Sequence, residues 1–180
     1  MSNSELVYTK PSVSEAIERH TIAVLVENEP GVLARVIGLF SGRGYNIESL
    51  TVAEVSTRKN VSRINIVTNG TPMIIEQIKH QLQRLVPIYE VVDLTEYGPH
   101  IEREVAMVKI VNDGAQRREA LRIADIFGAK VTDTTIGSFV FSMTGETEKV
   151  DSFIDLMKAL GDVEVARSGV VAISRGAEIL

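Results

Sequence analysis

The 180-residue sequence contains no cysteine and no tryptophan, and aromatic residues make up only 5% of it. Without cysteine there can be no disulfide bond, no thiolate metal ligand and no cysteine nucleophile. With so few aromatic rings, a surface on which nucleotide bases stack is not expected. The lack of cysteine also fits a cytoplasmic protein, because reduced compartments do not use disulfides for stability.

Long apolar runs and an excess of positive charge are also lacking. No run approaches the ~20 residues of a transmembrane helix, and the polar segment 1–19 lacks the apolar core of a secretory signal. The net charge is −5, with acidic and basic residues interspersed, so no basic stripe favours nucleic acid. The sequence therefore predicts a cytoplasmic protein of one domain or two small ones, without nucleic-acid or membrane partners.

The first half of the chain has the pattern of a β-α-β-β-α-β unit. Its helices are indicated by apolar residues at helical spacing, and its strands by short apolar runs bounded by turn residues. Pro30 suits a first helical turn, and Gly42 and Gly44 suit the end of that helix. The expected elements are strand 19–27, helix 30–43, strand 46–56, strand 61–68, a second helix after the turn 69–72, and strand 86–96.

The second half repeats this order, which indicates an internal duplication. Five positions recur at a constant offset of 75: Gly70, Ile75, Ile78, Leu82 and Leu85 correspond to Gly145, Val150, Phe153, Met157 and Leu160. The expected elements are strand 104–111, helix 116–127, strands 130–136 and 138–143, helix 147–160, and strand segments 162–166 and 170–174.

The predicted fold class is α+β, with two ferredoxin-like βαββαβ units in tandem. The predicted boundaries are an N-terminal extension at 1–18, a first domain at 19–96 and a second domain at 97–180, which begins with the linker Tyr97-Gly98-Pro99-His100. In such a unit both helices cover one face of the sheet and leave its edge unprotected. A second subunit could cover that edge, which favours a symmetric dimer.

The most informative segment is 26–50. An apolar strand stops at the polar turn Glu27-Asn28-Glu29-Pro30-Gly31, a helix follows, and Tyr45-Asn46-Ile47 begins the next strand. The turn delivers a helix N-terminus, where free backbone N–H groups and a partial positive charge gather. Such a place binds a small anion, for example the carboxylate of an amino acid. The pattern indicates a sensor of a small metabolite rather than a catalyst.

Three blocks resemble a known family: Glu27–Leu33, Arg35–Leu50 and Val163–Gly176. Glu102-Arg103-Glu104 is also similar to that family. The first unit resembles an ACT domain, the amino-acid-sensing ferredoxin-like module. From about His20 to the C-terminus, the chain resembles the small regulatory subunit of acetolactate synthase, or acetohydroxyacid synthase, of bacterial type.

The resemblance implies a non-catalytic subunit. In that family a separate catalytic, or large, subunit carries thiamine diphosphate, a divalent metal (Mg²⁺) and FAD, and condenses pyruvate with pyruvate or 2-oxobutyrate. This reaction leads to valine, leucine and isoleucine. The small subunit raises that activity and confers feedback inhibition, usually by L-valine. The implied partners are a second copy of the chain, paired through the ACT domains, and the catalytic subunit.

In related ACT dimers the effector lies between the first loop of one subunit and the second strand of the other. Here a valine carboxylate would meet backbone N–H groups, and the asparagine amides would bind its polar groups. Gly31 would let the backbone approach the ligand, because a Cβ would intrude. The expected effector-binding residues are Asn28, Glu29, Pro30, Gly31, Val32 and Leu33 of one subunit, and Asn46 and Ile47 of the other.

Simpler interpretations stand beside these. Gly31 could serve only a turn, Asn46 could cap a strand start, and the block 167–176 could be a final edge strand rather than a contact with the catalytic subunit. In the latter role Arg167 and Arg175 would be the anchors. The three histidines, His20, His80 and His100, lack ligand spacing and are expected at the surface or at strand ends, so no metal site is predicted.

The turn of the second unit, Asn112-Asp113-Gly114, lacks the proline and the following apolar pair. It is not expected to bind valine, and could serve dimerisation, docking or another effector. Three other functions compete: a transcription regulator, for which residues 1–19 leave no room for a helix-turn-helix; a ferredoxin-like enzyme, for which no clustered chemistry is found; and a structural oligomerisation module. Activation of a purified catalytic partner would separate the subunit from all three.

Overall fold

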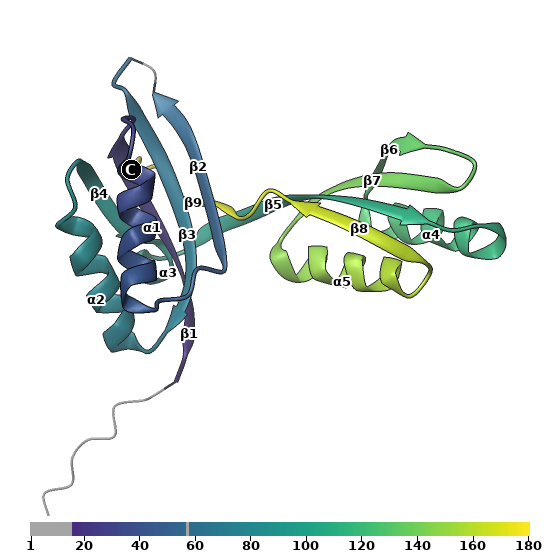
Figure 1. The fold of residues 1–180 in the computed structure, drawn as a ribbon, viewed down its shortest axis with the longest axis horizontal. Coiled ribbons are helices and arrows are strands. Elements are labelled where there is room, and N and C mark those ends of the chain that lie inside the picture. The colour runs from purple at the N-terminus through teal and green to yellow at the C-terminus, as the bar shows by residue number, and fades with distance from the viewer. Residues whose placement is uncertain (1–15, 57) are drawn as a thin grey trace, which may run out of the picture.

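The computed structural model describes residues 16–56 and 58–180, so most of the predicted extension 1–18 lies outside the described residues. The first unit forms an antiparallel sheet in the order β2-β3-β1-β4, with both helices on one face (Figure 1). Its elements are β1 (Glu18–Glu27), α1 (Val32–Arg43), β2 (Ser49–Ser56), β3 (Val61–Gly70), α2 (Pro72–Gln83) and β4 (Ile88–Asp93).

The second unit repeats this topology, with the strand order β6-β7-β5-β8. Gly70 ends β3 and Gly145 ends β7, so the predicted offset of 75 holds between the corresponding elements. The α+β class with two βαββαβ units is thus confirmed. The elements are β5 (His100–Val111), α4 (Gly114–Phe127), β6 (Lys130–Thr134), β7 (Ser138–Gly145), α5 (Thr147–Lys158) and β8 (Asp162–Arg167).

Each unit has its own apolar core between helices and sheet. In α1 the buried side chains are Val32, Val36 and Phe40, one helical turn apart, so a single stripe faces the sheet. The helix ends at Gly44, which adopts a left-handed conformation and donates to the carbonyl of Ser41 at 3.3 Å. This buried stripe positions α1, and with it the loop at its N-terminus.

The structure differs from the expected elements where the two units meet. The strand predicted for 86–96 ends at Asp93, and a short helix α3 (Leu94–Tyr97) follows. The Asp93 carboxylate accepts a hydrogen bond from the Thr95 backbone N–H at 3.0 Å, which caps this helix and ends the strand.

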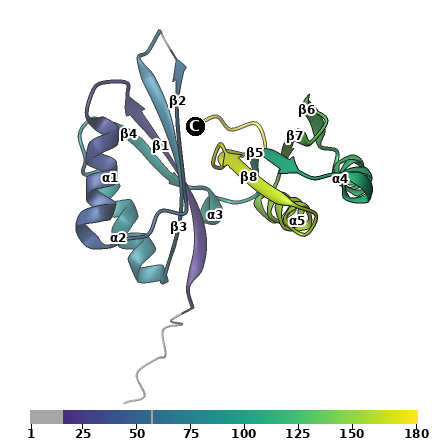
Figure 2. The same ribbon diagram turned by 45° about the vertical axis from the view of Figure 1, so that its right-hand side comes forward.

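The last strand, β9 (Val171–Ser174), does not join the main sheet of the second unit. It pairs with the first residues of β5, His100–Arg103, outside that sheet. There Ala172 is buried with Ala23 and Leu94 of the first unit, and Val92 and Leu180 pack against them. The C-terminal segment therefore lies on the face of the first sheet opposite α1 and α2 (Figure 2).

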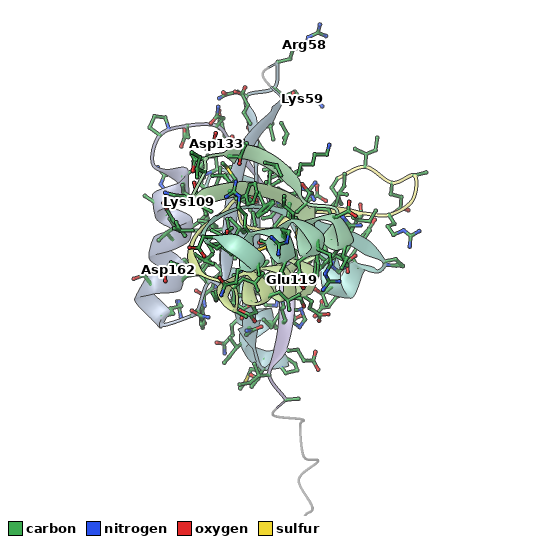
Figure 3. The ribbon with its side chains drawn as sticks, turned by 90° about the vertical axis from the view of Figure 1, so that its right-hand side faces the viewer. Arg58, Lys59, Lys109, Glu119, Asp133 and Asp162 are labelled. Carbon is green, nitrogen blue, oxygen red and sulfur yellow. The ribbon has the colours of Figure 1, made fainter. Side chains whose placement is uncertain are left out.

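Strand β2 lies at the edge of the first sheet, where only β3 pairs with it. The hairpin that joins these strands carries Arg58 and Lys59 at its tip, far from the helices of the second unit (Figure 3). The opposite end of β2 follows Asn46 and Ile47. The two halves of the predicted effector site, the β1–α1 loop and Asn46 with Ile47, therefore lie at opposite ends of β2.

Candidate functional site

The loop between β1 and α1 presents the start of a helix to solvent. The first helical hydrogen bond of α1 runs from the Arg35 N–H to the Gly31 carbonyl, at 3.0 Å. The Val32 N–H bonds to the Glu29 carbonyl at 3.5 Å, and the amides of Leu33 and Ala34 have no acceptor within the helix. Asn28, Glu29 and Leu33 are exposed around them. The loop can therefore donate several backbone N–H groups to a small anion.

Gly31 has a backbone reason for being glycine. It is the N-cap of α1 with φ 91°, a left-handed conformation that other residues adopt only with strain. Apart from its two neighbours in the chain, no described residue has an atom within 4 Å of the place where a Cβ would stand. The sequence argument relied on close approach of a ligand, whereas the structure shows the requirement for positive φ.

The apolar residues of the predicted pocket have different surroundings. Val32 is 4% exposed and belongs to the core of the first unit, while Leu33 is 38% exposed. Ile47 is half-buried and packs against the same core. Of the three, Leu33 is the side chain free to touch a ligand directly.

Asn46 and Ile47 lie far from the loop within one chain. Helix α1 has 12 residues between them, which corresponds to roughly 18 Å. Asn46 is exposed, and its backbone carbonyl accepts a hydrogen bond from the Thr68 hydroxyl at 2.6 Å. A single chain therefore does not bring Asn28 and Asn46 together.

Arg167 and Arg175, the predicted anchors for another subunit, differ in their environment. Arg167 bonds through its guanidinium to Glu104, which is 3% exposed, and to Asp151 at 2.6 Å. The hydrogen bond with Glu104 raises the pKa of Arg167, although burial acts against it. Arg175 is exposed and lines a cleft of about 800 Å³ between the units. Arg175 thus has the freer side chain.

The same cleft contains balanced charges. Arg19 pairs with Glu102 at 2.9 Å, and Arg103 pairs with Glu146 at 3.0 Å. Glu102 also accepts a hydrogen bond from the Thr21 hydroxyl. Burial raises the pKa of the Glu102 carboxyl, but the hydrogen bonds from Thr21 and Arg19 outweigh it and leave the pKa below its usual value. Glu102 therefore links the two units as a carboxylate.

His20 was expected at the surface or at a strand end. It lies two residues from the start of β1, but its side chain is buried. His20 is 4% exposed, and its Nδ1 lies 2.7 Å from Asp93 Oδ2. Single ligand atoms of His20, Asp93 and Glu96 lie within 4.8 Å of one another. The ammonium of Lys79 hydrogen-bonds to Glu96 and Glu76, so the cluster contains a cation of its own. Burial acts against the charge of Lys79, but these two bonds raise its pKa.

Sequence reasoning missed the contact between β2 and the C-terminal segment. The Val170 N–H donates to Ser49 Oγ at 2.7 Å, and the Thr51 hydroxyl donates to the Val170 carbonyl at 3.0 Å. Arg63 of β3 donates to the Ala172 carbonyl at 3.0 Å. These residues are 109 to 121 positions apart, so local sequence patterns could not reveal the contact. It joins the strand after Asn46 and Ile47 to the second unit.

Comparison with known proteins shows that both units of the chain match family models. The family model described as "AHAS small subunit-like ACT domain" matches residues 22–90, and "Small subunit of acetolactate synthase" matches residues 103–176. Within the described residues, no helix is long and apolar enough to cross a membrane.

Three relatives have similarity over nearly their whole length. The probable acetolactate synthase small subunit of Archaeoglobus fulgidus is 45% identical, covering 88% of this chain and 98% of that protein. The acetolactate synthase isozyme 3 small subunit of Escherichia coli is also 45% identical, covering 90% and 99%. The crystal structure of the acetolactate synthase small subunit from Thermotoga maritima is 35% identical, with a TM-score of 0.79 over 89% of this chain and 99% of that one. The chain therefore belongs to the family of acetolactate synthase small subunits and carries an ACT-type regulatory domain.

Proposed function

We propose that this chain is the regulatory subunit that binds a separate catalytic acetolactate synthase subunit, raises its activity and confers feedback inhibition by L-valine. Membership of the small-subunit family supports the partnership. The ACT-type first unit, with an exposed helix N-terminus beside Asn28, supports the sensing of an amino acid. Thiamine diphosphate, Mg²⁺ and FAD would belong to the catalytic partner, and this chain would supply no catalytic group.

The observation that carries the proposal is the position of the two half-sites at opposite ends of the edge strand β2. Its start lies beside Asn46, whereas its end lies beside the β1–α1 loop, since Ser56 and Glu27 both pair with Val61. Antiparallel pairing of two β2 strands about a twofold axis would bring the start of one strand to the end of the other. The Asn46 of one subunit would then face the Asn28 loop of its partner.

In a valine bound between two subunits, the carboxylate, the ammonium group and the side chain would each contact a different part of this site. Its carboxylate would accept from the first-turn amides of α1, and its ammonium group would donate to the Asn28 or Asn46 amide oxygens. Leu33 would cover the isopropyl group. Bound valine would stabilise one arrangement of the dimer, and inhibition would follow if that arrangement supports the catalytic subunit less well. Such coupling is typically worth about 1–3 kcal/mol.

The first test is calorimetric titration of the purified chain with L-valine, with D-valine and L-alanine as controls. We expect saturable, stereospecific binding near one valine per chain. A chain that binds no valine, but still activates a purified catalytic partner, would contradict the sensing role and leave only the partnership.

The second test is Gly31→Asp, measured as inhibition by valine of the complex with the catalytic subunit. The new carboxylate would repel the valine carboxylate, so inhibition should be lost while activation is retained. Gly128→Asp is the matched control, because Gly128 also has positive φ, 71°, and open space around it but lies in the second unit. Full inhibition of the Gly31→Asp complex would show that the site is elsewhere.

A further inference from the structure

The second unit places an asparagine where the first unit has Asn28. Each follows the first strand of its unit on the row of residues that faces the helices: Val24, Val26 and Asn28 correspond to Val108, Ile110 and Asn112. Each donates its backbone N–H to the turn before the third strand. Asn28 bonds to the Asn60 carbonyl at 2.7 Å, and Asn112 to the Gly137 carbonyl at 3.2 Å. The two positions are therefore structurally equivalent, although their loops differ in sequence.

The side chain of Asn112 differs from that of Asn28 in a way that requires explanation. Asn28 is exposed, whereas Asn112 is 9% exposed and neither its Oδ1 nor its Nδ2 has a hydrogen-bond partner. Among the described residues, five buried side-chain atoms lack partners, and three of them belong to Asn112 and Arg117. Unpaired buried polar groups are costly, so such a cluster points to a missing partner.

Arg117 covers this end of the second unit. Its guanidinium lies over the ring of Phe139, 3.7 Å from the centre, and its Nη2 donates to Thr134 Oγ1 at 3.1 Å and to the Thr135 carbonyl at 2.6 Å. Its Nη1 is buried without a partner. Arg117 and Asn112 are thus tethered to the same turn between β6 and β7.

The N-terminus of α4 adds backbone donors. The first amide that bonds back is Arg117 N–H, to the Asp113 carbonyl at 3.2 Å, so the amides of the turn before it have no acceptor within the helix. The Asp113 side chain makes no capping bond and is exposed. The unpaired Asn112 amide, the first-turn N–H groups of α4 and Arg117 thus belong to one short stretch of chain, 112–117. That stretch is bonded at both ends to the turn at 134–137, and Asp113 supplies an acid within it.

We propose that the second unit has its own binding site for a small carboxylate, built from Arg117, Asn112 and the N-terminus of α4. The ligand carboxylate accepts from Arg117 Nη1 and the first-turn amides, and the Asn112 amide binds a second polar group on the neighbouring carbon. That group is the carbonyl of a 2-oxo acid or the ammonium of an amino acid. Because the unpaired atoms are closed to solvent, the Arg117 side chain must leave Phe139 to admit the ligand.

The test is an amide NMR titration of the full chain carrying Gly31→Asp, which separates this site from valine binding in the first unit. Pyruvate and L-valine are added separately, each to about 10 mM. We expect saturable shifts at Gly114, Ala115 and Gly137 with one of them, and its identity distinguishes a 2-oxo acid from an amino acid. Absence of shifts with both ligands would overturn the proposal and leave valine sensing through the first unit intact.

Arg117→Gln and Asn112→Ser, made separately, test the named side chains. Each should weaken binding at least about tenfold, as expected for loss of a hydrogen bond to a charged group. Arg118→Gln is the matched control, because it removes the same charge from the next, exposed residue. Thermal melting identifies a variant that does not fold. In that case the affinity of the other, folded variant tests the proposal. Unchanged affinity in a folded Arg117→Gln or Asn112→Ser chain would show that the shifts come from another site.

Discussion

The two sheets differ on the face that points away from their helices. In the first unit this face is covered by the C-terminal segment, and β1 is buried over six of seven consecutive residues from His20 to Val26. In the second unit the corresponding face is open. Val105, Met107 and Val111 of β5 are 41%, 47% and 52% exposed. The second unit thus supplies a covering strand to the first but has none itself, so the two copies of one fold differ in the apolar surface that they leave available.

The largest expected effect on stability concerns the ion pair between Arg167 and Glu104, at the end of β8 where the chain turns back toward the first unit. Arg167→Ala leaves the buried Glu104 carboxylate without its cation, which should cost about 3–5 kcal/mol in the free energy of unfolding. Arg175→Ala, at an exposed position past β9, should change it by less than about 0.5 kcal/mol. Urea denaturation measures both, and equal effects would contradict the structural difference between the two arginines.

An intermediate effect on stability is expected at Gly169, where the C-terminal segment crosses the first sheet. Gly169 has φ 83°, and an added Cβ would lie 2.9 Å from Ser49 Oγ and from Thr51 Cγ2. Gly169→Ala should therefore combine backbone strain with displacement of β2, at about 2 kcal/mol or more. Gly31→Ala shares the positive φ but has open space, so about 1 kcal/mol is expected. Hydrogen exchange of β2 and β3 amides should increase in the first variant only.

The smallest effect concerns the polar link at Glu102. Because its folded pKa lies below the usual value, the ionised carboxylate stabilises the fold at neutral pH, and this contribution is lost as the pH falls below about 4.5. Glu102→Gln should flatten the loss of stability between about pH 5 and pH 3, by less than about 1 kcal/mol. Glu148→Gln, at an exposed position, is the control. If Glu102→Gln leaves the pH profile unchanged, the Glu102 carboxylate does not stabilise the contact between the units.

The repeated fold could be predicted because its determinants are local. The offset of 75 follows from duplication and is confirmed. Helical spacing also indicated an apolar stripe on the first helix, of which Val32, Val36 and Phe40 are buried. Leu33 and Ile37, which the same spacing placed on that stripe, are 38% and 40% exposed. The fate of 170–174 could not be predicted, because its pairing with β5 depends on residues about 70 positions away. The alternation of burial along β5 was also hidden, since exposed Val105 and Met107 are as apolar as their buried neighbours.

The candidate site was predictable only in part. The turn at Glu29 and Gly31 indicated a helix N-terminus, and the structure has one there. That Val32 belongs to the core follows from its place on the helical stripe, and the structure confirms it. The Asp93 cap of α3 had a local indication, since Asp93 and Glu96 have the spacing of a capping box. Contacts such as His20 with Asp93, 73 residues apart, had none.

The pairing of β9 with the start of β5 means that the chain passes between the units twice, once outward and once on its return. A single connection would act as a swivel about which either unit could turn. Two antiparallel strands, bonded to each other and fixed to the first sheet by Thr51 and Arg63, form a ribbon that resists torsion. Twisting of one unit against the other is therefore the motion that the junction opposes, and flexing across the ribbon is the motion it leaves soft.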